Sequence, residues 1–236
     1  MPSCGHPETA VPDGLWLNIG CGPSNPAGWI NIDGSWQVRL ARYPAASRAL
    51  SRVIRRPVGD WPAGIVHHDL RRGLRFGDGS AAVVYSSHLL EHLYRDEAVK
   101  LLGEARRVLR PGGICRIVVP DVRQIVRWYL ESPETGDETS PSSSDILMDM
   151  MMVRPHGPAR LNGGLLMRLY RRVTHFDAHK WMYDGAGLRQ IFREAGFEAP
   201  AERRYLESSI ARERLQLVEA RDRLCEGAGV CVEARA

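Results

Sequence analysis

The chain has 236 residues, of which 44% are hydrophobic and 25% charged, a composition typical of one larger globular domain. Its formal net charge is only +4. The sequence has no run of five or six like charges, so it shows no nucleic-acid-binding tail. No stretch approaches about 18 consecutive apolar residues, and the N-terminus lacks a signal-peptide pattern, so we expect no membrane span.

The cysteines are five in number and scattered, and no two of them form a C-x-x-C pair. They therefore indicate neither a disulfide framework nor a zinc site. Free thiols fit a reducing compartment, and we expect the protein to be cytoplasmic.

Short apolar segments alternate with helical patterns through the first half of the chain, after a tail at residues 1–14 that we expect to be flexible. Apolar residues recur at helical spacing over Arg95–Leu109, and Pro111-Gly112-Gly113 is expected to end that helix. Several of the strands are continuously apolar, which favours a mostly parallel sheet covered on both faces. The expected strands are Leu15–Ile19, Trp29–Asp33, Gly64–Asp69, Ala81–Ser86 and Ile114–Val119.

Residues 122–183 are too long for a plain connection, so we expect an insertion over one end of the sheet. Val122–Leu130 has a helical pattern, and residues 132–144 are polar and loop-like. The first strand begins near residue 15, so we expect no N-terminal helices that could cover the substrate. We therefore expect this insertion to cover it.

After the insertion, Asp184 is suited to cap a helix that runs to Ala195 and is closed by Gly196. The remaining chain is predicted to form two strands with a helix between them. In chain order these are Arg203–Glu207, Ile210–Leu224 and Val230–Ala234.

The strongest chemical motif is L-N-I-G-C-G-P at residues 17–23, followed by Asp33 after the next strand. A strand, a G-x-G turn and a later acid are the parts of a nucleotide site, because glycines let backbone approach a ligand and the acid binds ribose hydroxyls. Asn25 stands where a dinucleotide fingerprint needs its third glycine, and Pro23 and Pro26 disfavour a following helix. The pattern therefore favours an adenosine ligand without phosphates over NAD.

Further motifs follow in order along the chain: G-W-I-N-I-D, H-D-L, Y-S-S-H-L-L-E-H-L, R-V-L-R-P-G-G and V-V-P-D. Together with L-N-I-G-C-G-P they resemble the class I S-adenosylmethionine-dependent methyltransferases, over residues 15–197. The segment at residues 179–183 resembles the H-x-W-M-Y pattern of a bacterial, methyltransferase type 11-like branch of small-molecule enzymes.

This resemblance implies a Rossmann-like methyltransferase fold. Its sheet would be seven-stranded and mostly parallel, with helices on both faces and an antiparallel last strand. Residues 15–236 would form a single methyltransferase domain that contains the insertion.

The resemblance also implies S-adenosylmethionine as cofactor. Asp33 would hold the ribose hydroxyls and Asp69 would accept from the adenine amino group, although either acid could instead cap a turn. Asn18 replaces the usual acid at the end of the first strand, which leaves its contact with the cofactor neutral. The implied cofactor-binding residues are Asn18, Gly20, Cys21, Gly22, Asp33, Asp69, Leu70, Ser86 and Ser87.

His88, Glu91 and His92 would share one face of a helix. Three roles remain open for them: a divalent metal site, a purely structural role, or acid–base catalysis. An imidazole titrates near neutral pH, so His88 is our first candidate for the general base and His92 our second.

Histidines also gather before the predicted helix at Asp184. His175, His179 and Tyr183 would either pack a loop or form the wall that binds the acceptor. Several arginines lie between residues 154 and 172, which suits an acidic, phosphorylated or carboxylated acceptor or simply a solvated surface.

The expected function is methyl transfer to an oxygen or nitrogen atom of a small molecule, such as a sugar or a natural-product intermediate in biosynthesis. An RNA or protein methyltransferase is the alternative within enzymes, although no aromatic-basic strip supports nucleic-acid binding. The third interpretation is a methyltransferase-like protein that binds a nucleoside or a partner without turnover. A homodimer is compatible with the sequence.

Overall fold

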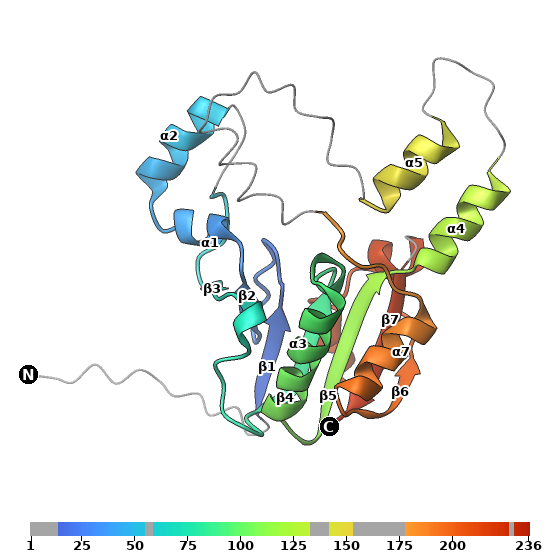
Figure 1. Cartoon of the computed structure of the whole chain (residues 1–236). Helices are drawn as coiled ribbons and strands as arrows, with labels where there is room; N and C mark the ends of the chain where they lie inside the picture. Colours follow the sequence, from blue (N-terminus) through green and yellow to red (C-terminus); the bar gives the residue numbers. More distant parts are fainter. Residues whose placement is uncertain (1–13, 55–58, 133–141, 153–177, 227–228) are drawn as a thin grey trace, which may run out of the picture.

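The computed structural model describes residues 14–54, 59–132, 142–152, 178–226 and 229–236. At its centre lies a seven-stranded sheet with the order β3-β2-β1-β4-β5-β7-β6 (Figure 1). The first five strands of that order pair in parallel, and β7 is antiparallel to both β5 and β6. This confirms the predicted Rossmann-like methyltransferase fold. The strands are β1 (Leu15–Ile19), β2 (Ile30–Asp33), β3 (Val66–His67), β4 (Ala81–Ser87), β5 (Leu109–Pro120), β6 (Glu198–Glu202) and β7 (Gly229–Arg235).

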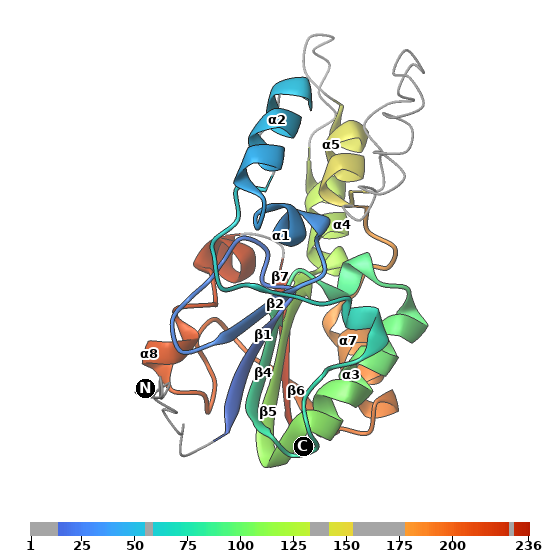
Figure 2. The same ribbon diagram turned by 90° about the vertical axis from the view of Figure 1, so that its left-hand side faces the viewer.

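Helices lie on both faces of this sheet (Figure 2). α3 and α7 cover one face, and α8 lies on the other. No helix among the described residues is long and apolar enough to cross a membrane. The described helices and short helical turns are α1 (Trp36–Leu40), α2 (Pro44–Ile54), η1 (Leu70–Arg72), η2 (Leu90–His92), α3 (Arg95–Val108), α4 (Val122–Glu131), α5 (Ser143–Met150), α7 (Gly185–Glu194), α8 (Arg212–Leu215) and η4 (Asp222–Glu226).

The core forms because the central strands are apolar on both sides. Leu17, Val84 and Ile117 are at most 1% exposed and pack in one large cluster with the inward faces of α3 and α7. Val83 and Tyr85 point to the opposite face, where a smaller cluster includes Leu215 of α8. Burial on both faces is the property of a parallel sheet, and it fixes the direction in which the strand ends project.

The carboxyl ends of β1, β4 and β5 point toward one end of the molecule, where α1, α2, α4 and α5 stand (Figure 1). In open α/β sheets this is the end at which ligands bind. Residues 133–141 and 153–177 of the predicted covering insertion lie outside the described residues. α4 confirms the helix predicted at its beginning, whereas α5 was not predicted.

No helix connects β1 to β2, as the prolines predict, and buried amides hold the connecting loop instead. Asn18 and Asn31 are register partners on the two strands, and Asn18 Nδ2 donates to Asn31 Oδ1 at 2.9 Å. Asn31 Nδ2 donates in turn to Asn25 Oδ1 at 2.9 Å and lies 3.1 Å from the carbonyl oxygen of Pro26. Side-chain hydrogen bonds thus replace the crossover helix that usually joins parallel strands.

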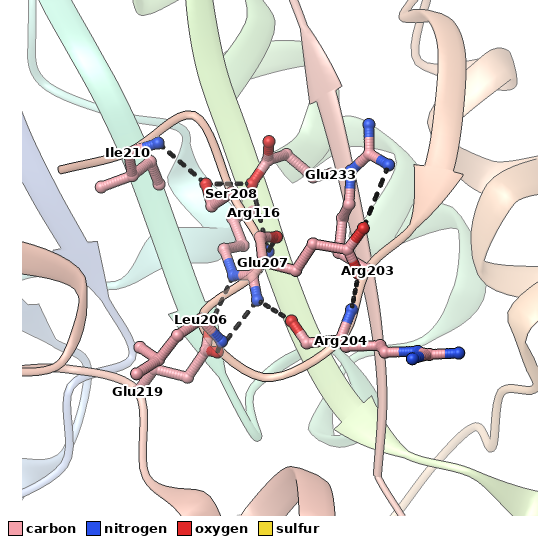
Figure 3. Close-up of polar contacts among 9 residues, drawn as sticks. All are labelled: Arg116, Arg203, Arg204, Leu206, Glu207, Ser208, Ile210, Glu219 and Glu233. Atoms are coloured by element: carbon pink, nitrogen blue, oxygen red, sulfur yellow. Dashed lines mark hydrogen bonds and ion pairs between the residues drawn. The ribbon is translucent and has the colours of Figure 1, made fainter. Parts of the chain in front are cut away.

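A buried arginine anchors the C-terminal part of the chain (Figure 3). The Arg116 side chain on β5 is fully buried, and its Nε donates to Glu219 at 2.5 Å while Nη1 donates to Glu233 at 3.1 Å. The guanidinium also donates to the backbone carbonyl oxygens of Arg204 and Glu207, both at 2.9 Å. It therefore joins the sheet to the loop after β6.

This network explains why two predictions for the tail are wrong. Residues 203–207 are not a strand, because their carbonyl oxygens turn toward Arg116. The strand is β6, one segment earlier, where Pro200 is tolerated because β6 is an edge strand. The helix expected over residues 210–224 is reduced to α8 and η4, because Glu219 points inward to the same arginine.

Other described boundaries up to the end of α7 are close to the predictions. Asp184 caps α7 by accepting from the Gly187 N–H at 2.8 Å, and Gly196 follows with a φ of +91°. α3 ends at Val108, before the expected Pro-Gly-Gly stop, because β5 already begins at Leu109. β3 spans only two residues, because His68 and Asp69 already turn into η1.

Candidate functional site

A cavity of about 870 Å³ opens at the carboxyl ends of β1, β2 and β4. This volume is at the upper end of the range for small-molecule sites, so it has room for a cofactor and part of a small acceptor. Its lining residues are Gly20, Cys21, Gly22, Asp33, Gly34, Ser35, Trp36, Gln37, Arg39, Trp61, His67, His68, Asp69, Leu70, Arg71, Arg72, Arg75, Ser87, His88, Leu89, His92, Leu93, Lys180 and Arg223.

The turn after β1 forms one wall of this cavity. Gly20 has a φ of +68°, and a Cβ there would lie 2.9 Å from the side chain of Leu89, so only glycine fits. Gly22 has a φ of +57° and open space beside it. Burial raises the pKa of the Cys21 thiol to about 12, so this cysteine is neutral and not a nucleophile at physiological pH.

Asp33, at the end of β2, holds the turn after β1 through its carboxylate. Its Oδ2 accepts from the Gly22 N–H at 2.9 Å, and its Oδ1 accepts from the Ser35 N–H at 2.7 Å. Each oxygen keeps a further lone pair for a ligand hydroxyl. Burial raises the pKa of this carboxyl above its ordinary value.

Asp69, which follows β3, lines the same cavity together with the buried Leu70. The carboxylate also caps η1, and Arg71 binds it through Nε at 2.9 Å and Nη2 at 3.0 Å. These hydrogen bonds lower the pKa of Asp69 and keep it ionised. Asp69 thus has the turn-capping role that the sequence left open. The carboxylate still keeps lone pairs for a ligand.

The end of β4 presents Ser87 and His88 to the cavity, whereas the fully buried Ser86 does not line it. His88 has a φ of +56°, a left-handed backbone that is uncommon for a residue with a side chain. Its Nδ1 lies 3.2 Å from Glu91 Oε1, without the geometry of a full hydrogen bond.

His92 also lines the cavity, and His179 packs against it with ring centroids 5.0 Å apart. Glu91 directly precedes His92 in η2 and is fully buried. Burial lowers the pKa of His179, so its imidazole is more readily neutral than an exposed one. The cluster at the end of β4 is thus richer in histidine than the sequence spacing alone indicates.

Asn18, His179 and Tyr183 were also predicted as site residues, and none of the three lines the cavity. The buried Asn18 side chain donates to Asn31 instead. Tyr183 is 2% exposed, and its backbone pairs with Val122 at 2.8 Å, so it supports the wall behind the histidines. His175 lies outside the described residues.

Sequence reasoning missed the basic lining of the cavity. Arg39 comes from α1, Arg75 from the loop after η1, and Arg223 from η4 near the C-terminus. Arg223 Nη1 lies 3.3 Å from Ser87 Oγ. No local motif marks these arginines, because only the fold brings residues so distant in sequence to one rim.

The turn at Gly20 and the acid at Asp33 lie in a segment whose sequence matches a known family. Residues 17–117 match the family model of a methyltransferase domain. The chain therefore contains a methyltransferase domain of the S-adenosylmethionine-dependent kind. No curated protein matches the methyltransferase significantly.

Solved structures similar to this methyltransferase include two bacterial proteins. One is an S-adenosylmethionine-dependent methyltransferase from Thermotoga maritima, titled a possible histamine N-methyltransferase, with 15% identity and a TM-score of 0.46 over 96% of this chain and 84% of that one. The other is an S-adenosylmethionine-dependent methyltransferase from Mesorhizobium loti, with 17% identity and a TM-score of 0.45 over 95% of this chain and 92% of that one.

The cofactor of the methyltransferase is S-adenosylmethionine. The residues present fit this group, because the turn exposes backbone at Gly20 and Gly22 and Asp33 keeps lone pairs toward the cavity. The missing helix after β1 also suits a cofactor without a pyrophosphate.

Proposed function

We propose that this methyltransferase methylates an oxygen or nitrogen atom of a small, negatively charged molecule. The observation that carries the proposal is the cavity itself, where the cofactor turn, His88 and a basic rim face the same space. A sugar acid, a sugar phosphate or a carboxylated natural-product intermediate has this chemistry.

In this proposal the turn at residues 20–22 holds the methionine part of the cofactor, Asp33 holds the ribose hydroxyls, and Asp69 with Leu70 holds the adenine. S-adenosylmethionine, when bound, supplies an activated methyl group. The chain then has to align the acceptor with that group and exclude water, and alignment alone is worth roughly 7–11 kcal/mol.

His88 is placed to take the proton that the acceptor loses as its new bond to the methyl carbon forms. The methyl–sulfur bond breaks and its electron pair stays on sulfur, which gives S-adenosylhomocysteine. Glu91 lies 3.2 Å from His88 Nδ1 and would stabilise the protonated imidazole. A general base of this kind contributes about 10²–10⁴-fold to the rate.

The charge of the acceptor is inferred from the lining of the cavity, which has six basic side chains and two carboxylates. Arg71 and Arg72 already pair with Asp69. Arg39 and Arg75 form no ion pair with a described residue, so they are available to an anionic ligand. Arginine binds carboxylate and phosphate in a bidentate manner, which would also orient the acceptor.

The first test is calorimetric titration with S-adenosylmethionine and S-adenosylhomocysteine, with NADH as the control ligand. We expect micromolar binding of both, lost in Asp33→Ala and weakened in Asp69→Ala. No binding of either would contradict the assignment of these site residues.

The second test screens acceptors in matched pairs, each a hydroxylated carboxylic acid and its methyl ester. Methylation of the acids and not of the esters is expected, and Arg75→Ala should raise the KM for the acid with less effect on kcat. Equal turnover of acid and ester would refute the charge preference. Methylation of bulk RNA but of no small molecule would favour the RNA alternative.

A further inference from the structure

Glu91 is a buried carboxylate that lacks ordinary partners. It is 0% exposed, and neither carboxylate oxygen accepts a hydrogen bond from a described residue. Among the described residues no lysine or arginine forms an ion pair with it. A buried carboxylate without donors is costly, so the fold must supply a compensating positive charge.

Imidazoles are the groups that surround this carboxylate. His88 Nδ1 lies 3.2 Å from Oε1. His92 and His179 each offer a nitrogen that, with a Glu91 oxygen, belongs to one set of atoms within 4.8 Å of one another. The Nδ1 atom of His92 is itself buried without a hydrogen-bond partner among the described residues. Three potential ligand atoms thus converge here, and the carboxylate among them accepts no hydrogen bond from a described residue.

Backbone hydrogen bonds hold two segments of this cluster together. The N–H groups of Lys180 and Trp181 donate to the carbonyl oxygen of Glu91 at 2.7 Å and 3.2 Å, which brings His179 beside η2. The His179 ring also contacts Met182, whose Sδ lies 3.2 Å from Nδ1. Contacts of the ring nitrogen that does not bind the ion help to orient a metal-bound histidine.

We propose that Glu91, His92 and His179 bind a divalent transition-metal ion, with Zn²⁺ as the best match. Two imidazoles and one carboxylate form a ligand set that Zn²⁺ uses when a further coordination position stays open. Bonds of about 2.1 Å require ligand atoms no more than about 4.2 Å apart, so binding draws the set slightly together. His88, whose Nδ1 lies 3.2 Å from Glu91 Oε1, is not part of this ligand set.

The open position of this ion would face the cavity, because His92 lines the cavity whereas Glu91 and His179 do not. Its role toward an anionic acceptor rests on the proposed function, since a metal ion there would bind a carboxylate or hydroxyl oxygen. The binding of the metal itself requires neither cofactor nor acceptor.

The experiment uses the full chain stripped with a chelator and titrated with Co²⁺ and Zn²⁺. We expect one Co²⁺ per chain, with the visible absorption bands of a four-coordinate N/O site, displaced by one Zn²⁺. His92→Ala and His179→Ala should each weaken binding by more than the roughly 10–100-fold typical of second-sphere losses. His67→Ala is the matched control, because His67 lines the same cavity outside the cluster and should leave metal affinity unchanged.

Glu91→Gln keeps the shape of the side chain and removes its charge, so it should abolish Co²⁺ binding. If that variant fails to fold, Co²⁺ binding by His179→Ala still tests the proposal, because His179 is only half-buried. Far-ultraviolet circular dichroism checks the folding of each variant. No stoichiometric binding, or binding that survives both histidine variants, would overturn the proposal.

Binding of S-adenosylmethionine is measured on the same stripped protein. Cofactor binding without metal binding would refute the metal site and leave the proposed function intact. Metal binding without cofactor binding would support the metal site and contradict the proposed function.

Discussion

Asp33 shows how one carboxylate can order a turn and still face a ligand. Its two oxygens accept from the N–H groups of Gly22 and Ser35, which fixes the backbone on both sides of the cavity. The same burial that makes these bonds strong also raises the pKa of the carboxyl. The ionised form is the better acceptor for ribose hydroxyls, so protonation should compete with cofactor binding.

We therefore predict that affinity for S-adenosylmethionine falls as the pH is lowered through the raised pKa of Asp33. The affinity is complete above that pKa and is lost below it, so the decline begins at a higher pH than an ordinary aspartate with a pKa of 3.8 would give. Calorimetry between about pH 4 and 8 measures this profile. Asp33→Asn should bind roughly 10–100-fold more weakly, with a flatter profile. A steep profile retained in that variant would assign the effect to another group.

His88 carries the second prediction at this scale. His88→Ala should lower kcat by about 10²–10⁴-fold, because the acceptor proton then has no base. The Kd for S-adenosylmethionine should stay within about twofold, since the imidazole serves the acceptor. Rapid-quench measurement of a single turnover isolates this step. Unchanged turnover would remove His88 from the mechanism.

At the scale of elements, β1 and β2 hold the cofactor turn through asparagines instead of a helix. The amides of Asn18 and Asn31 are 4% and 2% exposed, and their bonds continue to Asn25 at the surface. Loss of one partner leaves the others buried and unsatisfied, which costs more than the bond itself.

Asn31→Ala should accordingly lower the free energy of unfolding by about 1–3 kcal/mol and weaken cofactor binding, because the loop at residues 20–29 loses its anchor. Urea unfolding and calorimetry measure the two effects. Asn25→Ala removes a more exposed member of the same network and should cost less. Equal costs in the two variants would mean that burial does not set the energetics of this loop.

The elements that the sequence predicts well are those with local signals. β1, β4 and α7 depend on continuous apolar runs or on a cap such as Asp184, all contained in a few neighbouring residues. β6 and the segment after it could not be predicted, because their conformation depends on Arg116, which lies nearly 90 residues away from Arg204. A long-range buried ion pair leaves no periodic trace in the segment that it shapes.

At the scale of the whole molecule, the site divides into two halves of different origin. The half proposed to bind the cofactor, with Gly20, Asp33 and Asp69, comes from consecutive strands, and short motifs place these residues at one cavity. The half proposed to bind the acceptor includes Lys180 and Arg223, which come from distant parts of the chain and converge only through the sheet order.

The Arg116 network joins the last part of the chain to the sheet. Arg116→Ala should destabilise the protein by about 3–5 kcal/mol, because Glu219 and Glu233 would remain buried without their partner. Thermal and urea unfolding measure this loss. Lys100→Ala removes an exposed ion pair with Asp96 and should change stability by less than about 1 kcal/mol. A similar small change in both variants would show that the buried arginine contributes little.

The left-handed backbone at His88 has a consequence for how descendants of this chain would diverge. Glycine fits such a φ without strain, so replacement by glycine would relieve roughly 1–3 kcal/mol while it removed the imidazole. The proposed role of His88 as a base is then what would keep a histidine at a position that backbone strain alone would give to glycine. Among related sequences, histidine at this position is therefore expected in enzymes that transfer a methyl group, and glycine in proteins that keep the fold without turnover.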